Sequence, residues 1–254
     1  MHAICIVLTF WYDYSMDKKF LTISEAAEFL DVSIDTLRRW DKSGKLVAAR
    51  KEGGTHRYYL KEDLALFSSD LLKLAKNWAF SGGDVPPEFY CSNSAIFQAR
   101  LLIMQDALIA SKKADKIFSL IVAVTGEIGN NSYDHNLGNW PDIAGVFFGY
   151  DINKGIIVLA DRGLGILGTL KRVRPSLINH QDALLVAFTE MISGRAPENR
   201  GNGLKFVRKI ISENPIDIFF QSGDAELKMK GNNPKLDIEK SKTSIIGCFI
   251  IINF

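Results

Sequence analysis

At residues 156–165 the chain reads IIVLADRGLG, an apolar run that ends in an aspartate and a turn with two glycines. The apolar residues have the composition of a buried strand, which places Asp161 at the strand end. A carboxylate fixed there can accept a hydrogen bond from the exocyclic amine of a flat base. Gly163 and Gly165 let such a base approach the backbone closely. The run therefore predicts a ligand pocket at this strand end. Helical and strand-like patterns alternate on both sides of it, which predicts a mixed α/β domain.

A second segment, EIGNNSYDH at residues 127–135, lies upstream in a helical pattern. Glu127, Asn131 and His135 recur every four positions, so on a helix they share roughly one face. A carboxylate and an amide oxygen one turn apart suit a general base beside a magnesium ligand.

A third segment, ENRGNGL at residues 198–204, leads directly into a helical pattern. Gly201 and Gly203 free backbone N–H groups there, and a helix N-terminus, with Leu204 in its first turn, favours phosphate. Arg200 can neutralise phosphate charge. The sequence has no glycine-rich loop ending in Gly-Lys-Ser or Gly-Lys-Thr, which disfavours a P-loop site. Taken singly, each segment has an ordinary alternative: a surface acid, a turn-forming aspartate or a plain glycine loop.

In this order and spacing, the three segments resemble the GHKL, or Bergerat-fold, ATPase family over about residues 95–254. The resemblance implies ATP and Mg²⁺ as ligands, with Glu127 as the catalytic base, Asn131 on the metal and Asp161 on adenine. It also implies a glycine-lined pocket for the base and phosphates: Gly163, Gly165, Gly201, Gly203. His135 either approaches the phosphates or is a hydrogen-bonded structural histidine, and both interpretations stay open.

The N-terminal part shows a different pattern, two short helices joined by a tight turn. Ser24 is the predicted N-cap of a helix over 25–30, and Ser33 that of a second helix over 34–41. Apolar residues between them would lock the helices together, which leaves Thr36, Arg38 and Arg39 on or near the outer surface. Such a pair of helices suits insertion into the major groove of DNA.

A hairpin is predicted next, because residues 46–50 and 56–59 flank Gly53 and Gly54. From Arg38 to Tyr58 there are seven basic residues and two acids, a net charge of +5. Such a local excess suits a phosphate backbone.

Three blocks of this part resemble the MerR/excisionase helix-turn-helix family over about residues 20–67: LTISEAA at 21–27, TLRRW at 36–40 and GTHRY at 54–58. The resemblance implies a winged helix-turn-helix whose second helix, with Thr36, Arg38 and Arg39, reads double-stranded DNA. Arg57 and Tyr58 in the wing would contact it too. Specific binding of this type implies a homodimer that reads two half-sites. The alternative, a small helical module that contacts protein, stays open.

The run SGGDVPP at residues 81–87 breaks any helix through its glycines and prolines. We therefore predict an α+β protein of two domains: a winged helix-turn-helix over 16–80, a linker over 81–94 and an α/β sandwich of the GHKL type over 95–254. Residues 1–15 are interpreted as an upstream extension, with Met16 as the natural start. The alternative is a short strand or tail.

Composition and cysteine spacing narrow the class of protein further. The chain has 254 residues, a net charge of +2 and three widely spaced cysteines, so a disulfide framework is not predicted and a cytoplasmic protein fits best. The apolar stretch over 3–12 is too short to span a bilayer and is not preceded by Lys or Arg, so neither a membrane anchor nor a signal peptide is predicted.

These patterns together predict a nucleotide-responsive transcriptional regulator that binds double-stranded DNA and ATP. The alternatives are a serine/threonine protein kinase of the anti-sigma type, or a slow ATPase, acting on a partner protein. The sequence upstream of residue 95 has no phosphoacceptor histidine on a dimerisation helix, which disfavours an autophosphorylating sensor kinase.

Overall fold

A computed structural model describes residues 20–30, 32–43, 46–50, 54–61, 63–64, 71–83, 85–112, 114–191 and 202–254. The chain divides into two units between Asp70 and Leu71. The predicted extension, residues 1–15, and the hairpin tip at Gly53 lie outside the described residues.

The first unit is built of two short helices and a two-stranded sheet: β1 (Phe20–Thr22), α1 (Ile23–Phe29), α2 (Ile34–Ser43) and β2 (Tyr58–Leu60). The prediction that Ser24 caps the first helix is wrong. The cap is Thr22, whose hydroxyl accepts from the Glu25 N–H while the Glu25 carboxylate accepts from the Thr22 N–H. This reciprocal capping box satisfies two N–H groups, so the helix begins earlier than predicted. Ser33 does accept from the Thr36 N–H at 3.1 Å, as expected for the second cap.

The described residues of the predicted hairpin form one bridge, Ala49 to Tyr58, and β2 also pairs with β1 in antiparallel register. This pairing closes the first unit around a small core. The buried members of that core are Ala26, Ala27, Leu37, Leu46, Ala48, Tyr59 and Leu64.

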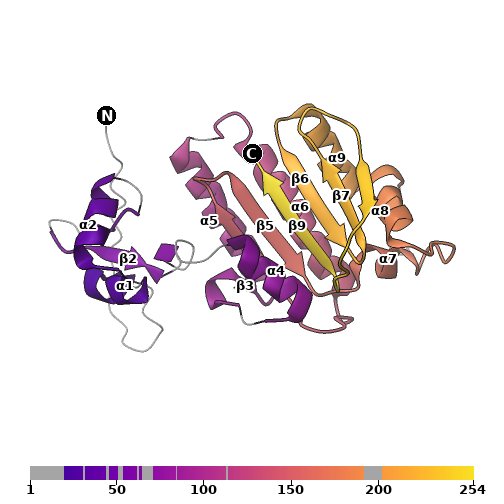
Figure 1. The fold of residues 1–254 in the computed structure, drawn as a ribbon. Helices are drawn as coiled ribbons and strands as arrows, with labels where there is room; N and C mark the ends of the chain where they lie inside the picture. The colour runs from indigo at the N-terminus through magenta and orange to yellow at the C-terminus, as the bar shows by residue number, and fades with distance from the viewer. Residues whose placement is uncertain are drawn as a thin grey trace. The chain divides into compact units, whose positions relative to one another are not determined.

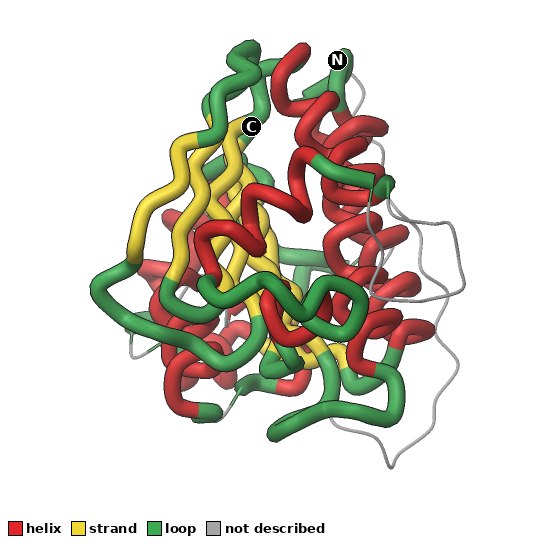
Figure 2. Tube along the Cα trace, turned by 90° about the vertical axis from the view of Figure 1, so that its right-hand side faces the viewer, coloured by secondary structure: helices red, strands yellow, loops and turns green. Residues whose placement is uncertain are grey.

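The second unit holds a seven-stranded sheet in the order β3-β4-β5-β9-β6-β7-β8, with antiparallel pairing throughout (Figures 1 and 2). Its strands are β3 (Tyr90–Cys91), β4 (Val146–Asp151), β5 (Ile156–Asp161), β6 (Asp217–Ser222), β7 (Ala225–Met229), β8 (Asp237–Lys240) and β9 (Cys248–Asn253). The terminal strand lies centrally because its isoleucine-rich sequence suits burial on both faces.

Helices cover one face of this sheet and enclose the main apolar core. They are α5 (Ser94–Ser111), α6 (Phe118–Asn136), α8 (His180–Thr189) and α9 (Gly203–Glu213), with the short α7 (Gly165–Leu170) beside α8. Phe148 points to this face, where its ring meets Phe97 of α5 edge to face at 5.2 Å.

The opposite face of the sheet is covered in part by α4 (Leu71–Ser81) (Figure 1). Trp78 of this helix lies 6.4 Å from the ring of Phe147, the neighbour of Phe148 that points the other way. Arg162 holds the end of the helix by donating from Nη1 to the carbonyl oxygens of Trp78 and Ala79 at 3.0 and 2.8 Å.

The packing of α4 differs from the predicted boundary, which assigned residues 71–80 to the first domain. The predicted linker also contains a 3₁₀ turn, η1 (Pro87–Phe89), and β3, the edge strand of the sheet. The apolar side of α4 packs on the sheet. The spacing of apolar residues predicts such a side but does not show which core the helix packs against. Among the described residues, no helix is long and apolar enough to cross a membrane.

Candidate functional site

The outer surface of α2 carries the basic residues that the sequence singled out. Arg38 and Arg39 are exposed, while Leu37 between Thr36 and Arg38 is buried. Arg38 Nη1 pairs with Asp35 at 2.9 Å, and Arg39 Nη2 donates to the Thr36 hydroxyl at 3.3 Å. These contacts are short-range and exposed, so both guanidinium groups remain accessible to an incoming polyanion.

Arg57 has a role that the sequence did not predict. Its Nε donates at 2.7 Å to Asp41 on α2, whose side chain is only 4% exposed. Asp41 also accepts from Arg50 and from the Ala48 N–H. Burial raises the pKa of Asp41, but these three hydrogen bonds outweigh it and hold the pKa below its ordinary value. Asp41 therefore ties the base of the wing to α2, and Arg57 is first of all part of that tie.

A groove lies beside this tie and is the best candidate for a phosphate contact in the first unit. Arg38 lines it from α2, while His56, Arg57 and Tyr58 line it from the base of the wing. Hydroxyl groups of Thr22, Ser24 and Thr55 complete the lining. A concave surface with cations and hydroxyl donors suits the DNA backbone.

In the second unit, Asp161 ends β5 as predicted and is 2% exposed. Its Oδ1 accepts from the Gly163 N–H at 2.9 Å and its Oδ2 from the Ser132 hydroxyl at 2.8 Å. The hydrogen bonds from Gly163, Ser132 and the Cys248 N–H lower the pKa of this carboxyl, but burial outweighs them and raises it above its ordinary value. No ion pair with Asp161 is found within the described part of the chain. The result is a desolvated carboxylate that still has acceptor capacity.

Glu127 and Asn131 lie one turn apart on α6, and Asn131 Nδ2 donates to Glu127 Oε1 at 3.3 Å. Gly203, the first residue of α9, lies directly against them. A Cβ on Gly203 would be 1.8 Å from Glu127 Oε1 and 3.1 Å from Asn131 Nδ2. Two segments far apart in the sequence therefore meet at a point where any side chain at position 203 would displace the Glu127 carboxylate.

These segments surround one cavity, part of which is open to solvent. Six of the predicted ligand-binding residues line it: Asn131, His135, Asp161, Gly165, Gly203 and Leu204. Gly165 opens α7 with a φ of +67°, a conformation that favours glycine.

His135 is largely buried against this cavity, and its Nδ1 has no hydrogen-bond partner among the described residues. Burial, with a smaller contribution from Arg172, lowers its pKa. A buried ring nitrogen without a partner is costly. Both interpretations of His135, a phosphate contact and a structural histidine, stay predictions.

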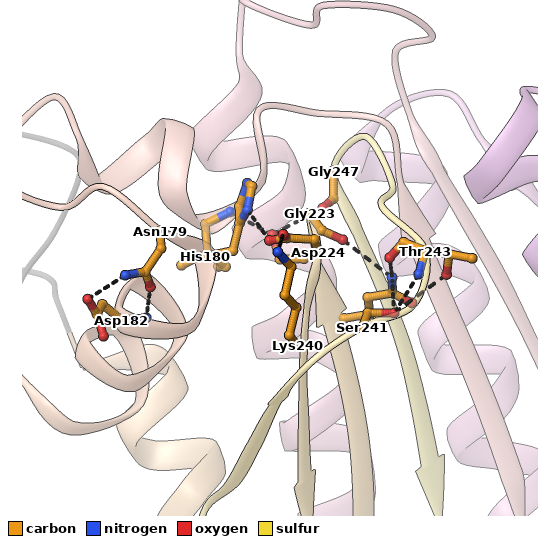
Figure 3. Close-up of polar contacts among 12 residues, drawn as sticks. Asn179, His180, Asp182, Gly223, Asp224, Lys240, Ser241, Thr243 and Gly247 are labelled. Carbon is orange, nitrogen blue, oxygen red and sulfur yellow. Dashed lines mark hydrogen bonds and ion pairs between the residues drawn. The ribbon is translucent and has the colours of Figure 1, made fainter.

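A polar network surrounds the turn between β6 and β7 (Figure 3). Ser222 at the end of β6 accepts from the Ile166 N–H at 2.9 Å and donates to the Gly247 carbonyl at 3.1 Å. In the following turn, Asp224 Oδ1 lies 2.6 Å from His180 Nδ1, and this contact lowers the pKa of Asp224. The start of α8 and the loop before β9 are thus fixed to the same turn.

Comparison with known proteins gives a family match for part of the first unit. Residues 22–59 match the family model described as MerR family regulatory protein. Residues 22–59 form a MerR-family domain. The Type II methyltransferase M.Eco47II of Escherichia coli is 41% identical over 64 residues, which are 25% of this chain and 15% of that enzyme. The chain thus spans about a seventh of that relative's length, and the likeness does not extend to most of either protein.

The MerR-family domain includes the exposed Arg38 and Arg39 and supports a DNA-binding regulator. In the second unit, Arg200 and Gly201 lie outside the described residues. Gly163 is not among the residues that line the cavity, and its N–H donates to Asp161. The roles of these residues in ligand binding stay predictions.

Several cavity residues were missed in the sequence. Ser132 lies within the quoted 127–135 segment and could have been noticed there. Phe220, Cys248 and Ile250 come from strands with no motif, so only the sheet order brings them to the cavity.

Proposed function

We propose that this chain is a DNA-binding regulator whose second unit binds ATP and whose DNA affinity responds to that nucleotide. The MerR-family domain supports the DNA-binding part. The nucleotide-binding part rests on one observation: Asn131, Asp161 and Gly203, from three separate segments, line the same cavity.

The cavity chemistry suits an adenine nucleotide. Asp161 offers a buried acceptor for an exocyclic amine, whereas the carbonyl oxygen that guanine carries at the same position would repel it. The walls beside it are apolar, with Ile166 and Phe220 among them, as a flat base requires.

The phosphates would lie at the start of α9. Asn202 makes no side-chain cap there, so the first N–H groups of the helix are available to an anion. Among the described residues, no group of three or more histidine, cysteine, aspartate or glutamate side chains could hold a metal ion. Mg²⁺ fits this site only together with nucleotide phosphates, and Asn131 would supply the protein oxygen. When bound, the ion would neutralise phosphate charge.

The test is a titration of duplex DNA with the full chain, with and without ATP. We expect binding that weakens steeply as salt rises, because phosphate contacts release counterions. Arg39→Ala should weaken it, and ATP should change the affinity. By linkage, DNA must then change ATP affinity by the same factor. The same DNA affinity at every ATP concentration would show that the two units act independently, and no binding at low salt would exclude the DNA-binding function.

A second candidate, phosphoryl transfer or hydrolysis, is favoured by the position of Glu127. Its carboxylate lies beside Gly203, where the phosphates would end, and can orient or deprotonate a nucleophile. With γ-labelled ATP, we expect label in released phosphate or in a second protein. Glu127→Ala should retain ATP binding and lose this turnover. If the unchanged chain leaves all label on the nucleotide, both alone and with candidate partner proteins, the site binds ATP without turnover.

A further inference from the structure

Arg162 follows Asp161 directly, and the two side chains leave the chain on opposite faces of the sheet. Asp161 lines the cavity, on the face that α5, α6, α8 and α9 cover. The Arg162 side chain contacts α4 on the other face. Successive residues of a strand alternate in this way, so a single backbone step of about 3.8 Å between α-carbons joins the proposed base contact to α4.

The guanidinium group of Arg162 is buried, and all three of its nitrogens donate hydrogen bonds. Nε and Nη2 donate to the carboxylate of Asp142, while Nη1 donates to the carbonyl oxygens of Trp78 and Ala79. These two carbonyls are among the last four of α4, where partners within the helix run out. The negative end of the helix dipole also favours a cation there. Arg162 is therefore the side-chain cap of α4.

The chain turns at Gly82 directly against this cap. Gly82 has a φ of +66°, and its N–H donates to the Trp78 carbonyl at 2.9 Å. A Cβ at this position would lie 3.4 Å from Cζ of Arg162 and 3.2 Å from Cδ1 of Ile143. The end of α4 and the guanidinium group are thus closely packed, and close packing transmits displacement from one group to the other.

The backbone of Arg162 is held by the same carboxylate that is the proposed base contact. Oδ1 of Asp161 accepts from the N–H of Gly163, two residues further on, and this hydrogen bond closes a turn with Arg162 in its middle. An amine bound to Asp161 would restrict this carboxylate and, through it, the turn. The turn sets the direction in which the Arg162 side chain leaves the chain.

We propose that Arg162 couples the nucleotide cavity to α4, so that ATP binding at Asp161 tightens the last turn of this helix. The proposal rests on the proposed function and deepens it, because α4 is the first element of the second unit and follows Asp70, the last residue of the DNA-binding unit. A ligand that orders one group lowers the entropy cost of ordering the groups bound to it. Arg162 thus acts as a positioning residue for regulation and does not itself contact ATP.

The test is hydrogen–deuterium exchange of the full chain, with and without saturating ATP, followed in peptides from residues 71–83. We expect ATP to slow exchange in the last turn of α4 at least about threefold in the unchanged chain. Arg162→Gln should still bind ATP but lose this slowing, because the shorter amide cannot reach Asp142 and both carbonyls together. In the DNA titration described above, ATP should no longer change the DNA affinity of this variant.

Arg100→Gln is the matched control, because Arg100 also donates to a backbone carbonyl, that of Pro87, but does not adjoin Asp161. It should keep the slowing. Asp142→Ala is a second test variant, which serves even where Arg162→Gln proves unfolded by circular dichroism. Asp142 is partly exposed, and its removal leaves Arg162 with the α4 carbonyls alone, so the slowing should shrink.

The proposal is overturned if ATP binds the unchanged chain by calorimetry but leaves exchange in α4 the same, a result that would leave nucleotide binding intact. Full slowing in both Arg162→Gln and Asp142→Ala would also overturn it, as would equal loss in Arg100→Gln. Absence of ATP binding to the unchanged chain would refute the proposed function, and this proposal with it.

Discussion

Asp161→Asn is expected to abolish measurable ATP binding to the full chain while leaving the fold intact. The carboxylate accepts hydrogen bonds on both oxygens, from Gly163 N–H and from Ser132. An amide has one oxygen, so its NH₂ group would face either a fixed N–H donor or the amine of the base. Loss of a buried hydrogen bond to a charged acceptor, with a donor left unpaired, corresponds to about a hundredfold or more in affinity.

Isothermal calorimetry measures this directly, with Asp151→Asn as the matched control. Asp151 is in the same strand pair but at its other end, since Asp151 faces Ile156 whereas Asp161 faces Val146. The control should bind ATP as the unchanged chain does. Undiminished binding by Asp161→Asn would remove the proposed adenine contact.

Gly203→Ala is also expected to lower ATP affinity, because the added methyl group would displace the Glu127 carboxylate from its place beside Asn131. The added methyl carbon would lie 1.8 Å from Glu127 Oε1, so either the carboxylate or the start of α9 must move. Gly168→Ala is the control, because a Cβ there meets only Leu164 at 3.4 Å, an ordinary contact. Calorimetry should show a large loss of ATP affinity for Gly203→Ala and no loss for Gly168→Ala.

The double variant Gly203→Ala with Glu127→Ala shows whether the clash with Glu127 causes the loss of ATP binding. Trimming Glu127 removes the atoms that the methyl group would meet, so ATP binding should return although turnover does not. If the double variant binds no better than Gly203→Ala alone, the glycine matters for another reason, such as access of phosphate to the backbone.

The candidate site could be predicted where its residues lie in short segments of the sequence. Glu127 and Asn131 needed only the helical period, and Asp161 only a buried strand ending in a turn. The antiparallel order that brings Cys248 and Phe220 beside them depends on pairing between distant strands, which periodicity does not encode.

In the first unit, the sequence predicted the local excess of positive charge but not which acid the arginines pair with. The excess of arginine near the wing is real, but Arg50 and Arg57 are drawn inward by Asp41. A run of residues shows how many charges lie near one another. It does not show which of them a buried acid has already paired.

Because α4 packs on the sheet and β3 is its edge strand, a fragment of the second unit needs both to keep the sheet covered. A fragment that begins at residue 95, where the sequence placed the second domain, lacks both. Phe147 then loses the tilted ring of Trp78 and the stacked ring of Phe89, and β4 loses the strand that pairs with Val146 and Phe147. An apolar face beside an unpaired strand edge is a template for edge-to-edge aggregation. A fragment that begins at Leu71 keeps that edge covered, so the smallest soluble piece of the second unit starts about two dozen residues before residue 95, where the sequence placed the domain.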